Sequence, residues 1–216
     1  MIYPYRIEQW KKRFRPFGVV IKCILFLLIL LIIFLLASNR MTPEKRLQIL
    51  RETQVPEWIN VQLIDVDGAS RRGEELQDVQ DIVIHYVANP GATAQNNRDF
   101  FNSAASNVSS HFVIGLDGEI IQCIPLNEKC SASNWRNLDS ISIEVCHPDE
   151  SGQFNDASYQ SLVRLTAWLC DLCGLKNDHI IRHYDITGKM CPLYYVEHPE
   201  AWEQFRRDVK STRGFF

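Results

Sequence analysis

The chain has 216 residues, of which 46% are hydrophobic and 23% are charged, so it is long enough for one globular domain and a further segment. The first 22 residues hold six lysines and arginines and one glutamate, and the whole chain has a formal charge of −3, so the remainder carries −8. Such an acidic remainder argues against nucleic acid as a partner, because nucleic-acid binding depends on basic contacts to phosphate.

The N-terminal segment predicts a membrane anchor in residues 18–37. These residues are apolar except for Lys22, and about 20 helical residues span roughly 30 Å of hydrocarbon. Residues 1–17 form a basic tail, which normally stays in the cytoplasm, so we expect a single-pass membrane protein whose remaining chain lies on the extracellular side. The alternative is a cleavable signal peptide. Its apolar region is usually about 7–15 residues long and ends in small residues, which the Leu-Leu-Ala sequence ending at Ala37 matches poorly.

The next segment, residues 38–54, is polar and charged, and we expect it to be a juxtamembrane linker. It contains a Thr-Pro-Glu helix start at Thr42. The folded domain is expected over residues 55–216. Its first element is an alternating stretch at 59–65, typical of an edge strand.

Apolar runs in the middle of the domain predict the strands of a sheet. The run at 81–87 is rich in β-branched residues and indicates a buried strand, as does the run at 140–146. Two more runs, HFVIGL and EIIQCI, are joined by an Asp-Gly dipeptide and predict a hairpin. Between the first strand and this hairpin, a helix is expected to follow an Asn-Pro-Gly turn and to reach about residue 105, with Phe100 and Phe101 facing inward.

The C-terminal part predicts two amphipathic helices with a short strand, 179–183, between them. Asp156 is the expected N-cap of the first helix and Gly174 its C-cap. The last helix is expected to follow Pro199. The apolar stripes of the two helices comprise Tyr159, Leu162, Leu165, Leu169 and Leu172, and Trp202, Phe205 and Val209. Alternating strands and helices indicate an α/β domain with a central mixed β-sheet flanked by helices, preceded by the single N-terminal transmembrane helix.

One short stretch, RHYDITGKMCP at 182–192, carries the clearest chemical signal in the chain. Its His183 and Cys191 are both zinc-ligand types, and Lys189 lies two residues before the thiol. A catalytic zinc needs one more protein ligand and an open position for water. His85, on the first buried strand, is the best candidate, although a single histidine on a strand is more often a hydrogen-bonded core or turn residue.

This pattern resembles the zinc-dependent N-acetylmuramoyl-L-alanine amidases, a family that includes phage endolysins, bacterial wall amidases and peptidoglycan recognition proteins. The resemblance covers about residues 58–210. In that family one histidine follows the first core strand, and a second histidine and a cysteine or aspartate come from a late loop, which His85, His183 and Cys191 match. The family's lysine and strand glutamate match Lys189 and Glu144.

The chemistry of amide hydrolysis agrees with these assignments. A zinc ion activates water and polarises the carbonyl group. Glu144, on an apolar strand that would raise its pKa, is then the expected general base, and Lys189 could stabilise the oxyanion. The alternatives are a salt-bridged structural acid for Glu144 and a solvated loop charge for Lys189. Asp185 is expected to be either a loop residue or a group that orients a ligand.

The other histidines and the cysteines leave further questions. Many relatives have a tyrosine where Ser110 precedes His111, and His111 either faces the cleft or forms a structural hydrogen bond. Three further histidines are expected to be structural or exposed: His147, His179 and His198. Six cysteines lie outside the metal motif: Cys23 in the anchor, Cys170 and Cys173 in the expected core of a helix, Cys146, and Cys123 and Cys130, which form either a disulfide or a buried reduced pair.

The resemblance implies a zinc hydrolase that cleaves the amide between N-acetylmuramic acid and L-alanine in peptidoglycan, and so degrades cell wall. The N-terminal segment adds the expectation that this hydrolase is anchored in the membrane. Its expected partners are a muropeptide substrate and, through the N-terminal helix, the membrane. A peptidoglycan-binding receptor without catalysis and a zinc peptidase acting on another amide are the alternatives. The oligomeric state is left open.

Overall fold

The computed structural model describes residues 19–31, 41–66 and 70–215. The chain divides into two units, residues 1–41 and residues 42–216. In the first unit, residues 19–31 are helical and all of their side chains are exposed. The rest of the expected tail and anchor, residues 1–18 and 32–37, lies outside the described residues. Within the described ranges, no helix is both long and apolar enough to span a membrane.

Helix α2, Pro43–Glu52, is the first element of the second unit. Thr42 is its N-cap and accepts a hydrogen bond from the Lys45 backbone, as the sequence predicts for a helix start here. Its buried apolar residues, Leu47 and Leu50, join the main hydrophobic core. Part of the expected juxtamembrane linker is therefore a helix that packs on the folded domain, and the compact unit begins at Thr42 instead of residue 55.

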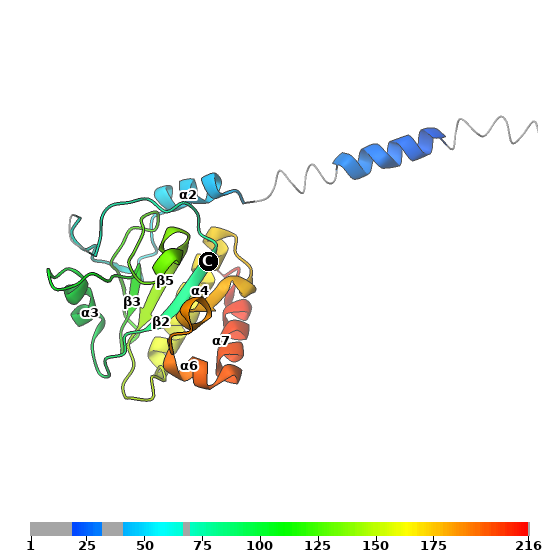
Figure 1. Cartoon of the computed structure of the whole chain (residues 1–216). Helices are drawn as coiled ribbons and strands as arrows, with labels where there is room; N and C mark the ends of the chain where they lie inside the picture. Colours follow the sequence, from blue (N-terminus) through cyan, green and yellow to red (C-terminus); the bar gives the residue numbers. More distant parts are fainter. Residues whose placement is uncertain (1–18, 32–40, 67–69, 216) are drawn as a thin grey trace, which may run out of the picture. The chain divides into compact units, whose positions relative to one another are not determined.

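A six-stranded mixed sheet forms the centre of this unit, which confirms the predicted α/β architecture (Figure 1). The strand order is β1-β4-β3-β5-β2-β6. Strands β3 and β4 are an antiparallel hairpin, as predicted, and every other neighbouring pair is parallel. The expected edge strand at 59–65 is at the edge but contains only two paired residues. The bounds are β1 Asn60–Val61, β2 Asp81–Tyr86, β3 Phe112–Ile114, β4 Ile120–Gln122, β5 Ser140–Val145 and β6 Ile180–Arg182.

The pairing register of β2 and β5 and the alternation of their side chains place core residues on one face of the sheet and candidate site residues on the other. Ile84 of β2 pairs with Ile143 of β5, and both belong to the main core. One position along, His85 pairs with Glu144, and Glu144 pairs on its other side with Val113 of β3. Because successive side chains on a strand point to opposite faces, His85 and Glu144 share the face opposite the main core, close to the carboxyl ends of their strands.

The helices pack on this sheet. Figure 1 shows α4 and α7, which also contact each other, alongside the sheet. Their predicted apolar stripes are confirmed in the core, with Tyr159 and Leu172 only partly buried. Gly174 is the C-cap of α4 in the left-handed conformation, as expected, but the N-cap is Asn155, whose side chain accepts from the Ser158 backbone at 2.9 Å. The bounds are α3 Ala94–Phe101, α4 Asp156–Cys173, α5 His183–Thr187, α6 Leu193–Glu197 and α7 Pro199–Thr212, with 3-10 turns η1 Asn134–Leu138 and η2 Asn177–His179.

Helix α3 ends at Phe101, earlier than expected, and only one of its phenylalanines faces inward. Phe101 is buried, but Phe100 is 49% exposed. The Thr93 cap fixes the start of the helix, and Ala94 and Phe101, seven residues apart, then occupy its buried stripe. Phe100 is rotated by about 100° from this stripe.

The buried cysteines are free thiols. Cys170 and Cys173 belong to the main core, as predicted for a helix interior. Cys123 and Cys130 also carry free thiols, which resolves the two alternatives in favour of a reduced pair. Burial raises the pKa of Cys123 to about 12 and that of Cys130 to about 11.

Candidate functional site

The three residues expected to bind metal meet at one place. Among the described residues, His85, His183 and Cys191 each offer a ligand atom, and these atoms lie within 4.8 Å of one another. All three side chains are buried. They come from strand β2, from the first turn of α5 and from the segment that follows α5. The fold thus joins positions that are about a hundred residues apart in sequence.

The metal motif is a compact turn around a short helix. Its first ligand residue, His183, begins α5, and Gly188, with a φ of 77°, is the C-cap of this helix. The Tyr184 backbone N–H then donates to the carbonyl oxygen of Cys191 at 2.9 Å, which closes the turn. Asp185 accepts from the backbone and guanidinium of Arg182 at 2.8 Å and 2.7 Å. Asp185 therefore fixes the start of the turn, and its described contacts are with Arg182 and not with a ligand.

Each imidazole ring uses one nitrogen, Nε2, to contact a neighbouring polar side chain, which leaves its other nitrogen, Nδ1, for the cluster. His85 Nδ1 lies 3.9 Å from Cys191 Sγ, while its Nε2 lies 3.1 Å from Ser133 Oγ. His183 Nε2 lies 3.3 Å from Asn134 Oδ1, and its Nδ1 is buried without a hydrogen-bond partner among the described residues. The ring centroids are 4.7 Å apart. Sequence reasoning missed Ser133 and Asn134, because the polar stretch around them has no periodic pattern.

These donors fit a zinc ion. A buried nitrogen without a partner, such as His183 Nδ1, is unfavourable unless something binds its lone pair. Burial lowers the pKa of both His85 and His183, and their neutral rings have the protonation state that a metal requires. Burial raises the pKa of Cys191 to about 12, so in the absence of a cation its thiol is protonated. Two imidazoles and one cysteine are a typical ligand set for catalytic zinc.

Glu144 lies beside this cluster. Its Oε1 is 4.0 Å from His85 Nδ1, and its Oε2 is buried without a hydrogen-bond partner among the described residues. Burial raises the pKa of Glu144 to about 8, against the opposing charge of Lys189. In the described part of the chain it forms no ion pair with lysine or arginine. The described residues therefore offer no lysine or arginine for the salt bridge that would make Glu144 a structural acid, which is the alternative that the sequence left open.

A cleft of about 230 Å³ opens over these groups. His85, Glu144 and His183 line it, together with the exposed Lys189. Its lining also includes the apolar side chains of Phe100, Phe101 and Val108. The exposure of Phe100, which contradicts its expected place in the core, thus contributes to the wall of the cleft.

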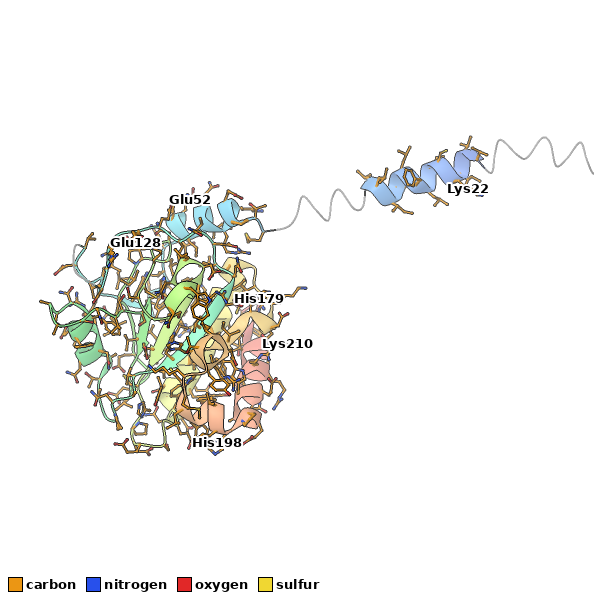
Figure 2. The ribbon with its side chains drawn as sticks, viewed as in Figure 1. Lys22, Glu52, Glu128, His179, His198 and Lys210 are labelled. Carbon is orange, nitrogen blue, oxygen red and sulfur yellow. The ribbon has the colours of Figure 1, made fainter. Side chains whose placement is uncertain are left out.

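The remaining histidines do not join the cluster. His111 is buried, accepts from the Ser142 backbone at 3.1 Å through Nδ1, and lies 2.8 Å from the Glu128 carbonyl through Nε2. It is therefore the structural residue of the two alternatives, and burial lowers its pKa to about 4. His147 is buried against Tyr86. His179 and His198 lie on the outside of the domain, at separate places (Figure 2).

Comparison with known sequences gives the family of this domain. A sequence model of the N-acetylmuramoyl-L-alanine amidase family, Amidase_2, matches residues 75–193, which include all the residues of the cluster and Glu144 and Lys189. The chain belongs to this family. The resemblance noted in the sequence is thereby confirmed.

Two curated amidases illustrate the relationship. The N-acetylmuramoyl-L-alanine amidase CwlL of Bacillus licheniformis is 34% identical over 168 residues, which are 70% of this chain and 46% of the relative. The amidase BlyA of Bacillus subtilis (strain 168) is 35% identical over 169 residues, which are 68% of this chain and 46% of the relative. The match thus spans about half the length of these curated amidases.

Solved amidase-like structures share the fold. A mutant endolysin from Bacillus subtilis has a TM-score of 0.62 and 25% identity, and the match covers 70% of this chain and 97% of the endolysin chain. The PlyG catalytic domain has a TM-score of 0.60 and 25% identity, with 72% and 95% covered. Nearly the whole of each of these domains therefore has a counterpart here.

Proposed function

We propose that this chain is a zinc-dependent hydrolase that cleaves the amide bond between N-acetylmuramic acid and L-alanine in peptidoglycan. The observation that carries the proposal is the position of Glu144, a partly buried acid without a lysine or arginine partner among the described residues, beside three converging metal-ligand side chains in an open cleft. Membership of the amidase family supports it. So do the names of the curated relatives, although this chain matches about half of their length.

The ligand residues of the proposed zinc site are His85, His183 and Cys191. Zinc bound there would lower the pKa of a coordinated water and polarise the substrate carbonyl. The role of Glu144 in this proposal is to accept a proton from the attacking water and to pass it to the leaving nitrogen of L-alanine. Its position one strand from His85, at 4.0 Å from the ring, supports this role.

Lys189 supplies positive charge at the same cleft. It opposes the effect of burial on the pKa of Glu144 and lowers the pKa of His85, so its charge reaches both groups. We assign it the stabilisation of the negative charge that develops on the carbonyl oxygen during attack. Phe100 and Val108 add apolar surface to the lining of the same cleft.

Digestion of defined muropeptides tests the activity. We expect the zinc-loaded protein to release a product with a free L-alanine amine, identified by mass. Binding of muropeptides without any cleavage would favour the receptor alternative. Cleavage at a different amide of the stem peptide would favour the peptidase alternative.

We also propose that the N-terminal segment anchors the protein in the cell membrane, with the catalytic domain on the extracellular side. The helix at 19–31 is apolar on every side apart from Lys22, which is typical of a helix buried in lipid or in a protein core. The basic residues that precede it favour a cytoplasmic N-terminus.

Protease treatment of intact, wall-stripped cells measures this topology. A tag at the C-terminus should be digested without permeabilising the membrane, whereas a tag at the N-terminus should be protected. Protection of the C-terminal tag would reverse the proposed orientation, and recovery of both tags in the soluble fraction would contradict anchoring.

A further inference from the structure

Two consecutive residues, Ser133 and Asn134, each contact one histidine of the proposed zinc site. We propose that this pair positions both imidazole ligands and selects the nitrogen that each presents to the metal. The inference rests on the proposed zinc site and adds to it residues outside the ligand set. It concerns positioning, because neither side chain belongs to the converging ligand group.

The contact with His85 selects its tautomer. Nδ1 of His85 faces Cys191 Sγ at 3.9 Å, so it is the nitrogen that would bind metal and must be unprotonated. The proton of the neutral ring is then on Nε2, which donates to Ser133 Oγ at 3.1 Å. Ser133 Oγ lies 2.8 Å from Ser142 Oγ on β5, so the hydroxyl has a partner for its own proton. Ser133 is fully buried.

The contact with Asn134 selects the same tautomer for His183. Asn134 Oδ1 can only accept, so His183 Nε2 donates to it and the lone pair is left on Nδ1. That Nδ1 atom is buried without a partner among the described residues, as a ligand atom without its metal would be. Both rings are thus fixed with Nε2 protonated and Nδ1 free for a cation.

Asn134, whose side chain contacts His183, has an uncommon backbone conformation. Its φ is 55°, in the left-handed region, where asparagine is tolerated better than most residues and glycine best. The turn that holds it is fixed by neighbouring contacts. Asn137 Oδ1 accepts from the backbone N–H groups of Ala132 and Ser133 at 3.1 Å and 2.6 Å.

The same turn is tied to the strand that carries His85. Arg136 pairs with Asp81, the first residue of β2, and with Asp139 at 2.6 Å. The turn η1 and the strand β2 therefore hold Ser133 and His85 in a fixed relation. Residues that orient ligand histidines in this way typically change metal affinity by about 10- to 100-fold when they are lost.

Asn134→Gly distinguishes the effect of the Asn134 side chain from the effect of its backbone conformation. Glycine accepts the positive φ without strain but removes the acceptor oxygen, so the zinc affinity should fall by about 10- to 100-fold while the melting temperature of the zinc-free protein is unchanged or slightly higher. Asn134→Asp keeps an acceptor and tolerates the same backbone, so it should restore most of the affinity. Affinity is measured with full-length protein in detergent by competition with a chromophoric zinc chelator.

Ser133→Ala tests the second contact against a matched control. Ser140 is also a buried serine, and its Oγ donates to the Arg136 carbonyl of the same turn at 2.7 Å without touching a histidine. We expect Ser133→Ala to weaken zinc binding by about 10-fold or more, and Ser140→Ala to change the melting temperature but not the zinc affinity. Unchanged zinc affinity in both Asn134→Gly and Ser133→Ala would overturn the positioning role of this pair but leave the proposed zinc site standing. Failure of the unsubstituted protein to bind zinc would overturn the proposed site itself.

Discussion

Replacement of His85 by alanine should remove zinc from the protein and abolish muropeptide hydrolysis. His85 is fully buried, lies beside Cys191 and His183, and comes from a rigid central strand, so no other described histidine can take its place. With two protein ligands left, the proposed site loses the three-ligand set that catalytic zinc requires. Zinc content is measured by elemental analysis of the purified protein, and activity by release of the L-alanine amine.

A histidine outside the cleft gives the control. His198 stacks on Tyr194, away from the ligand group, so His198→Ala should retain one zinc per chain. Removal of zinc from the unsubstituted protein by a chelator should stop hydrolysis, and adding zinc back should restore it. If His85→Ala kept a full complement of zinc and normal turnover, the assigned ligand set would be wrong.

Glu144→Gln should lower turnover by about 10²- to 10⁴-fold while zinc and muropeptide binding are retained. Glutamine has the shape of glutamate but does not accept the proton from water. The carboxylate lies 4.0 Å from the ring of His85 and is not in the ligand group, so the metal affinity should not depend on it. Turnover is measured at saturating muropeptide. A variant that turned over at the normal rate would exclude Glu144 as the base.

The pH dependence of stability gives a second measurement for the same substitution. In the zinc-free protein, burial raises the pKa of Glu144 to about 8, so between about pH 4.5 and 8 the folded state holds a proton that the unfolded state has lost. The contribution of Glu144 to stability therefore falls as the pH rises through this window. Glu144→Gln removes this loss, and its melting temperature relative to the unsubstituted protein should be higher at pH 9 than at pH 5. A difference that did not change with pH would contradict the raised pKa.

The sequence predicted the sheet well because its strands are local patterns. Apolar runs around His85 and Glu144 identify β2 and β5, and the Asp-Gly turn identifies the hairpin. The ligand motif is also local, since His183 and Cys191 lie within one turn. What brings His85 to them is the parallel pairing of β2 with β6, whose last residue precedes His183.

Features that depend on distant contacts could not be predicted in the same way. Helix α2 has a charged composition, and its Arg46 is buried because its guanidinium donates to the Cys173 carbonyl and pairs with Asp78. The side of α3 on which Phe100 lies is set by the phase of that helix. The contacts of Ser133 and Asn134 with the histidines arise only once β2 and α5 are in place.

Core and cleft occupy alternate positions of the same two strands, with Ile84 and Ile143 on one face and His85 and Glu144 on the other. Substitutions at the core positions change packing without touching the reacting groups. One inserted or deleted residue within either strand would exchange the two faces and move the chemistry into the core. During divergence of this domain, β2 and β5 should therefore accumulate substitutions but keep their lengths, and changes in length should be confined to the connecting loops.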